Sequence, residues 1–231
     1  MRPWQHARAS AARGARAWSD DLAIHEFMDC TKASLGDLRH RMVLHNCDLG
    51  PALAAMAFAE RPHAESVARD HAREDLGADV PLSWWLDRCL VSRFPRQRAN
   101  TSDDELIERA TERFGLDDDR AARAVLSVLT LPERLAPSHG RDARCVLGNE
   151  AGVAIVRAVL GPAREIPTTR GKSVVFDPAY CAEMMVHRWF RRIPSLRELA
   201  DALGPDAQLH LDDLRSRRAR ETHTPQFKSH R

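Results

Sequence analysis

Two histidine–aspartate pairs are the residues of this sequence whose spacing could support chemistry. His25 is followed four positions later by Asp29, and His71 is followed four positions later by Asp75. Side chains four residues apart on a helix share a face, with Cβ atoms about 5–6 Å apart. An imidazole and a carboxylate at this spacing can grip one ion from adjacent turns, and such ligands suit zinc, manganese or iron. The two pairs therefore predict a divalent metal site between two helices.

Further side chains extend this candidate site. His40 shares a narrow arc with His25 and Asp29 on a straight helix, and it is a candidate additional metal ligand. A bound metal would lower the pKa of its water and create a nucleophile near neutral pH. Cationic side chains would hold an anionic substrate such as a phosphoester, and a carboxylate would act as the base. The candidates for these roles are Lys32, Arg39, Arg41 and Glu74.

The same residues also fit a purely structural role. An aspartate one turn from a histidine can simply hold the ring through a hydrogen bond. Glu74 and Asp75 lie near a predicted helix C-terminus, where acidic side chains are unfavourable, so Lys32 or a nearby arginine could compensate them without a metal. That arrangement would be a satisfied polar network joining two helices. The sequence leaves a functional site and a scaffold network both open.

The remaining histidines are assigned away from the site. His45 projects toward the apolar side of a straight helix, which predicts a core residue rather than a ligand. His6, His63 and His139 are predicted to be surface residues.

The elements that must position these side chains are predicted to be mainly α-helical. The apolar stripe from Ile24 to Met42 indicates one long helix over Leu22–Asn46. A short apolar helix, Pro51–Glu60, should connect it to the helix Ala64–Leu76, with Gly77 as its C-cap. The expected fold is a helical bundle-like domain with one small β-hairpin, whose second strand is Ser173–Phe176.

The chain divides at the basic, proline-containing connector Arg93–Asn100. The predicted parts are a histidine- and aspartate-rich unit over residues 1–92, a second helical unit over 101–205, and a basic tail over 206–231. The second unit could be a degenerate repeat of the first, with His187 matching His71 and Pro194 matching Pro81. The histidine-bearing opening helix has no clear counterpart in this comparison.

Charge, cysteine content and hydropathy narrow the expected partners and cellular compartment of the protein. A net charge of +2 over 231 residues does not indicate a polyanion partner for the whole molecule. The five cysteines are scattered and form no C-x-x-C, which favours a reducing cytoplasm over a disulfide framework. No apolar run is long enough to span a bilayer, so no membrane partner is expected.

The order of the motifs resembles an uncharacterised family of small bacterial and phage proteins. The motifs are H-A-x-x-S, I-H-x-x-x-D-x-x-K, R-H-R-x-x-x-H and H-x-x-E-D-L-G, followed by a proline and a tryptophan, over about residues 3–90. The residues that carry the resemblance are His6, Ala7, Ser10, Ile24, His25, Asp29, Lys32, Arg39, His40, Arg41, His45, His71, Glu74, Asp75, Leu76, Gly77, Pro81 and Trp85. The chain departs from the family in a connection near Arg61–Glu65 that is cut to a few residues and in one extra residue before Pro81. The family implies no activity.

Two functional hypotheses follow. The first is a metal-binding helical protein that acts as a metal-dependent phosphoester or nucleotide hydrolase on a small anionic molecule. The second is a non-catalytic, phage-type accessory module that binds a protein or a nucleic acid, the latter through the arginine-rich ends of the chain.

Overall fold

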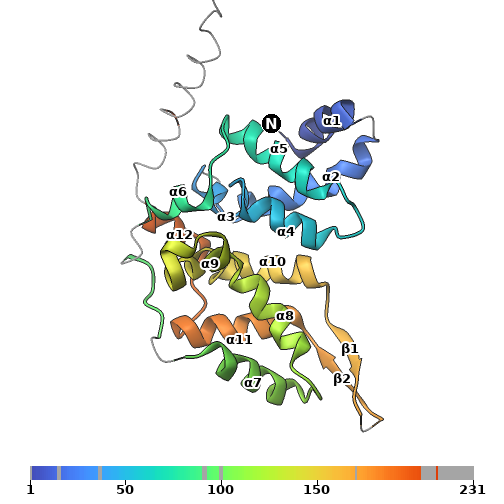
Figure 1. The fold of residues 1–231 in the computed structure, drawn as a ribbon, viewed down its shortest axis with the longest axis vertical. Helices are drawn as coiled ribbons and strands as arrows, with labels where there is room; N and C mark the ends of the chain where they lie inside the picture. The colour runs from blue at the N-terminus through green and yellow to red at the C-terminus, as the bar shows by residue number, and fades with distance from the viewer. Residues whose placement is uncertain are drawn as a thin grey trace, which may run out of the picture.

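The computed structural model describes residues 2–14, 17–35, 38–89, 93–98, 101–169, 171–203 and 212. They fold into two groups of helices, one stacked on the other, with one antiparallel β-hairpin at the far end (Figure 1). The prediction of a mainly helical fold with a small hairpin is confirmed. Within the described residues, no helix is both long and apolar enough to cross a membrane.

The first group holds the candidate site. Its elements are α1 (Pro3–Gly14), α2 (Trp18–Met28), the 3-10 turns η1 (Cys30–Ala33) and η2 (Leu38–His40), α3 (Arg41–Leu44), α4 (Leu49–Ala57), α5 (Ala64–Leu76) and α6 (Leu82–Leu86). Helix α2 packs against both α1 and α5, and α4 packs along α5. The predicted helix over Ala64–Leu76 is confirmed, and Gly77 ends it with a left-handed φ of 71°.

The second group is built from the other half of the chain. Its elements are α7 (Asp103–Phe114), α8 (Arg120–Leu129), α9 (Leu131–Leu135), η4 (Pro137–Val146), α10 (Glu150–Leu160), β1 (Arg164–Pro167), β2 (Ser173–Phe176), α11 (Pro178–Phe190) and α12 (Leu196–Ala202). The strands pair with Arg164 opposite Phe176. The predicted strand Ser173–Phe176 is confirmed.

The prediction of one long helix over Leu22–Asn46 is wrong. The α-helical hydrogen bonds end at Met28, and Asp29 leads into the 3-10 turn η1. Helical geometry returns only briefly, in η2 and α3, before His45. The residues after Asp29 include Thr31 and Ser34, whose weak helix propensity permits this break. The chain therefore folds back on itself instead of running straight.

The two groups share the same order and packing of helices. Helix α8 packs on α7 and α11 as α2 packs on α1 and α5, and α10 packs on α11 as α4 packs on α5. The buried positions of α5 and α11 have identical spacing. They are Ala64, Val67, Ala68, His71, Ala72, Asp75 and Leu76 in α5, and Pro178, Cys181, Ala182, Met185, Val186, Trp189 and Phe190 in α11.

The helix ends agree as well. Helix α11 stops at Arg191 with a left-handed φ of 63°, at the position that Gly77 occupies after α5. This pairing aligns Met185 with His71, whereas His187 is exposed, so the predicted match of His187 to His71 does not fit the burial pattern. It also places Ser195, not Pro194, opposite Pro81. The repeat stays a prediction, which these registers support.

A buried asparagine makes the same connection in both groups. The Asn46 amide donates to the carbonyls of Met42 and Val43, while its oxygen accepts from the backbone of Asp48 and Leu49. Asn149 makes the same bonds, donating to the carbonyls of the third and fourth residues before it and accepting from the second and third residues after it. Each side chain thus joins the end of one helix to the start of the next.

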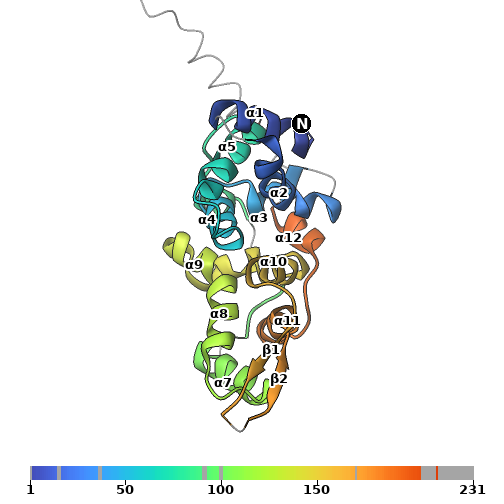
Figure 2. The same ribbon diagram turned by 90° about the vertical axis from the view of Figure 1, so that its right-hand side faces the viewer.

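The two groups meet through packed hydrocarbon. Helix α4 packs on α10 and α9, α6 lies against η4, and α12 lies against η2 (Figures 1 and 2). Buried apolar residues of both groups belong to one continuous core cluster. The predicted division into units at 92 and 101 stays a prediction.

After each of these asparagines, a glycine allows the start of the next helix to lie close to the backbone that precedes it. A Cβ at Gly152 would lie 1.8 Å from the carbonyl oxygen of Leu147. A backbone atom cannot rotate away, so we expect Gly152→Ala to lower the free energy of unfolding by about 3 kcal/mol. Urea denaturation checks this, with Ala154→Ser at an exposed position of the same helix as the control. A loss below that of the control would contradict the close contact.

Candidate metal centre

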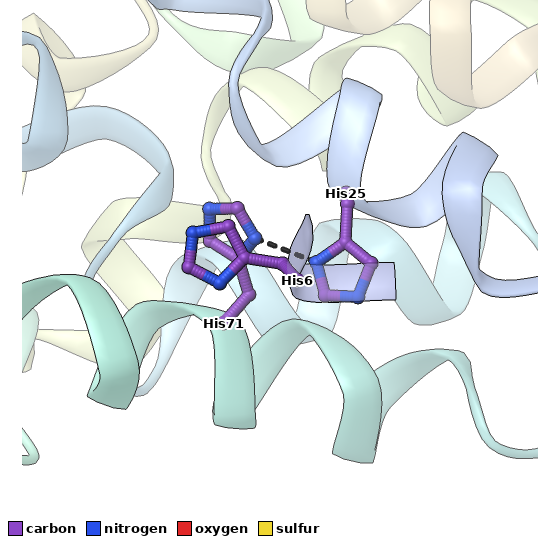
Figure 3. A group of neighbouring side chains, drawn as sticks. All are labelled: His6, His25 and His71. Atoms are coloured by element: carbon purple, nitrogen blue, oxygen red, sulfur yellow. Dashed lines mark hydrogen bonds between the residues drawn. The ribbon is translucent and has the colours of Figure 1, made fainter. Parts of the chain in front are cut away.

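Three histidines from three helices converge where α1, α2 and α5 meet. His6 comes from α1, His25 from α2 and His71 from α5, and all three are fully buried (Figure 3). His25 Nδ1 lies 2.7 Å from His71 Nδ1. The predicted convergence of the two histidine-bearing segments is therefore present, and it lies inside the core.

A chain of hydrogen bonds assigns the protons of these rings. The Ser10 hydroxyl donates to the His6 carbonyl at 2.9 Å, so its oxygen accepts from His25 Nε2 at 2.8 Å. Burial, with the neighbouring imidazoles of His71 and His6, lowers the pKa of His25 to about 3, so its Nδ1 carries a lone pair near neutral pH. His71 Nδ1–H then donates to that lone pair. The other ring nitrogen of His71, Nε2, faces the opposite side.

That opposite side holds a second cluster, formed by Asp29, His45, His71 and Asp75. His45 Nε2 lies 3.0 Å from His71 Nε2 and 3.4 Å from both Asp29 Oδ1 and Asp75 Oδ2. His71 Nε2 lies 3.7 Å from Asp29 Oδ1. One atom of each of the four side chains lies within 4.8 Å of the others, as metal ligands require. These groups could hold a metal ion.

His6 serves a different purpose from the four converging side chains. Its Nδ1 lies 2.7 Å from Glu74 Oε2, and its Nε2 lies 3.2 Å from Asp75 Oδ1. Burial lowers the pKa of His6, but the Asp75 and Glu74 carboxylates outweigh burial and raise it. His6, His25 and His71 also form a group with metal-ligand spacing. Both ring nitrogens of His6 face carboxylates, and a proton lies between His25 Nδ1 and His71 Nδ1. These nitrogens are not free to bind an ion, so this group is the poorer ligand set.

The two aspartates are ionised although they are buried. Burial raises the pKa of Asp29, but the imidazoles of His45 and His71 lower it more, to well below its usual range. Burial likewise raises the pKa of Asp75, and His6 with Arg41 brings it far below normal. Burial lowers the pKa of His45 to about 4, so this ring is neutral. The cluster thus offers two carboxylates, the neutral ring of His45 and the ring of His71.

The other predicted site residues differ in whether they contact the cluster. Arg41 Nη2 lies 3.0 Å from Asp75 Oδ2, and Glu74 is held by His6 and Arg13. Lys32 Nζ lies 3.8 Å from Asp29 Oδ2. Arg39 turns away to the Ala200 carbonyl and Asp201 of α12. The His40 ring stands perpendicular to that of His45 at 5.4 Å and belongs to neither converging group. The catalytic and ligand roles of all these residues stay predictions.

The sequence placed His6 incorrectly and His45 only in part. His45 is a buried core residue, as predicted, but its ring also lies among the candidate ligands, because the helix that set its predicted angle is broken. His6 is buried, not at the surface, and contacts both Glu74 and Asp75. The H-A-x-x-S motif, which pairs His6 with Ser10, was the signal available for His6. His63 contacts Asp21 at 3.3 Å, and His139 contacts Asp87 at 3.2 Å.

The second group of helices carries different residues at the corresponding positions. His6, His25, Asp29, His45, His71 and Asp75 correspond to Leu106, Leu126, Thr130, Gly148, Met185 and Trp189. Asp29 and Thr130, for example, both cap the C-terminus of their helix, and His45 and Gly148 both precede the connecting asparagine. A similar set of helices is therefore packed around hydrocarbon instead of imidazole and carboxylate.

The fold and the cluster together define a helical domain with a buried histidine–aspartate centre. Residues 1–94 match the model of a protein family described as a domain of unknown function, DUF6915. This confirms the resemblance of the N-terminal residues to an uncharacterised family. No curated protein and no solved structure matches the chain.

We expect Arg41 to contribute to the stability of the fold by compensating the buried Asp75 carboxylate. Its Nη1 also donates to the Asp75 carbonyl at 2.9 Å, and its side chain is 11% exposed. Removing one partner of a buried ion pair strands the other, so we expect Arg41→Ala to cost about 3 kcal/mol in urea denaturation. Arg39→Ala is the control, since Arg39 contacts an Asp201 side chain that is 63% exposed and the Ala200 carbonyl, so that its removal leaves no buried charge without a partner. Equal losses in the two variants would contradict this role.

Proposed function

We propose that the protein binds one divalent transition-metal ion through Asp29, His45, His71 and Asp75. The observation that carries this proposal is the convergence of two carboxylate oxygens and two imidazole nitrogens from three segments of the chain. Zinc, manganese and iron(II) all accept this combination of nitrogen and oxygen ligands.

The spacing of the ligand atoms supports the proposal. Tetrahedral coordination with bonds of about 2.0–2.2 Å separates neighbouring ligand atoms by about 3.3–3.6 Å. The four separations between ligand atoms given above run from 3.0 to 3.7 Å. Neither carboxylate oxygen of Asp29 has a hydrogen-bond partner among the described residues, although both are buried. An ion would satisfy this carboxylate.

The alternative of an inert scaffold network is less consistent with the second group of helices. There Leu126, Met185 and Trp189 fill the positions of His25, His71 and Asp75, with the same spacing of buried residues. Burying charge is costly where hydrocarbon would serve, and replacing a buried ion pair by apolar residues is often neutral or stabilising. The polar cluster is thus not needed for this helix arrangement, which favours a role in binding.

His25 is a positioning residue in this proposal. Histidines that bind metals usually donate their other ring N–H to an acceptor that fixes the tautomer and the ring orientation. His25 Nδ1 is that acceptor for His71, and Ser10 fixes His25 in turn. The predicted role of His25 as a direct ligand is therefore replaced, in our proposal, by support of His71.

Hydrolysis of a phosphoester or nucleotide is the finer form of this hypothesis. The ion would lower the pKa of a bound water. Lys32, with its side chain 44% exposed, is the best placed of the predicted residues to attract an anion. The four ligand residues, however, are only 0–9% exposed. Their burial supports an ion retained in a closed site more than an ion that meets substrate. Binding of a partner protein or a nucleic acid stays a prediction.

Metal analysis of the purified chain tests the ion site. We expect about one zinc, manganese or iron(II) ion per chain after reconstitution. Asp29→Asn and His71→Met should each weaken binding by at least about 100-fold, because a lost ligand costs more than a lost outer partner. His71→Met introduces the residue found at the corresponding position of α11. His187→Ala, at an exposed histidine outside the cluster, is the control.

Circular dichroism identifies the variants that are folded, and only these are compared in the metal-binding test. A wild-type chain that binds none of the three ions would overturn the proposed function. The metal-loaded protein is also the preparation in which phosphoester hydrolysis should be assayed.

The role of His25 is tested by His25→Leu, which introduces the residue of the corresponding position of α8. We expect metal affinity to fall by about 10–100-fold while the stoichiometry stays unchanged, because the four ligands remain. Cobalt absorption spectra and competition titrations give both quantities. A complete loss of binding would instead identify His25 as a ligand, and an unchanged affinity would remove it from the site.

A further inference from the structure

The second group of helices has an open pocket between α7 and α11, the counterparts of α1 and α5. Its volume is about 590 Å³, which lies within the range of about 300–1,000 Å³ typical of small-molecule sites. Leu106 and Met185 form its buried base. These residues correspond to His6 and His71 of the first group. The pocket therefore lies, in the second group, beside the position that corresponds to the polar cluster.

The two seams differ in charge pairing. In the first group, Arg13 on α1 reaches Glu74 on α5 at 2.7 Å. The burial registers align Arg13 with Arg113 and Glu74 with Arg188. Both arginines line the pocket, and neither forms an ion pair with any described residue. Two like charges on facing helices repel each other unless an anion lies between them.

Part of the remaining lining is apolar and partly exposed. Tyr180 is 40% exposed and Ile193 is 37% exposed, and both border the pocket with Met184. Arg113 Nη2 donates to the Tyr180 hydroxyl at 3.3 Å, which holds the guanidinium at the rim. Glu112 and Glu183 also line the pocket, and Arg109 adds a third arginine to it.

We propose that this pocket binds a small organic anion, with the apolar body of the ligand on Met184, Met185 and Ile193 and its anionic group between Arg113 and Arg188. The guanidinium groups suit a carboxylate, sulfonate or phosphate, because each can donate two parallel hydrogen bonds to such a group. This site is separate from the proposed metal centre and does not rest on it.

Fluorescent probes test the proposal on the full chain. Anilinonaphthalene sulfonate has an apolar body and one anionic group, and phenylnaphthylamine is its uncharged analogue. We expect saturable binding of the sulfonate. Arg113→Glu and Arg188→Glu should each weaken it by about tenfold or more, since a charge-assisted hydrogen bond contributes about 1.5–3 kcal/mol. Binding of the uncharged analogue should change little. Arg188→Glu also restores the charge pairing of the first group, opposite Arg113.

The control is Arg157→Glu, which makes the same charge change at an exposed position of α10 outside the pocket. A sulfonate affinity that falls equally in this control would show a general charge effect and overturn the proposal. Equal loss of both probes in the pocket variants, or no saturable binding to the wild type, would also overturn it. Thermal denaturation confirms that each variant is folded.

Discussion

Compensation of two buried carboxylates is the constraint on which the first half of the molecule depends. Asp29 and Asp75 are both ionised inside the core, and each ion removed from water costs several kcal/mol. They are contacted by side chains of several elements, among them His6 on α1, Arg41 on α3 and His71 on α5. Because these contacts join segments far apart in the sequence, the cluster also fixes how the helices of this half meet.

The second half shows that this constraint is not imposed by the fold. Helices of the same order and burial pattern close there around Leu126, Met185 and Trp189. What the two halves keep in common is the backbone connection, in which Asn46 and Asn149 join successive helices through the same hydrogen bonds. The fold thus depends on helix ends and apolar packing, while the polar cluster is an additional feature of one half.

The sequence predicted the local elements better than their arrangement. Helix Ala64–Leu76, the cap at Gly77 and the strand Ser173–Phe176 follow from periodicity and turn residues, and the structure has them. The His-x-x-x-Asp spacing identified Asp29, His71 and Asp75, which do converge. His45 was correctly predicted to be buried, but its place among the candidate ligands was missed. Its angle was calculated on a straight helix, and a break at Asp29 depends on tertiary contacts that periodicity cannot register.

Burial patterns resolve the internal correspondence where residue identities mislead. Matching histidine to histidine pairs His187 with His71, yet one is exposed and the other is inaccessible. Matching buried positions pairs Met185 with His71 and Arg188 with Glu74, and this exchange reverses the charge that faces α7. Arg13 and Glu74 pair across one seam, whereas Arg113 and Arg188 both line the open pocket of the other. The buried cluster of the first group suits a tightly retained ion, and the open pocket of the second suits a ligand that enters and leaves. The replacement of an acidic by a basic side chain would thus give the two halves different binding roles.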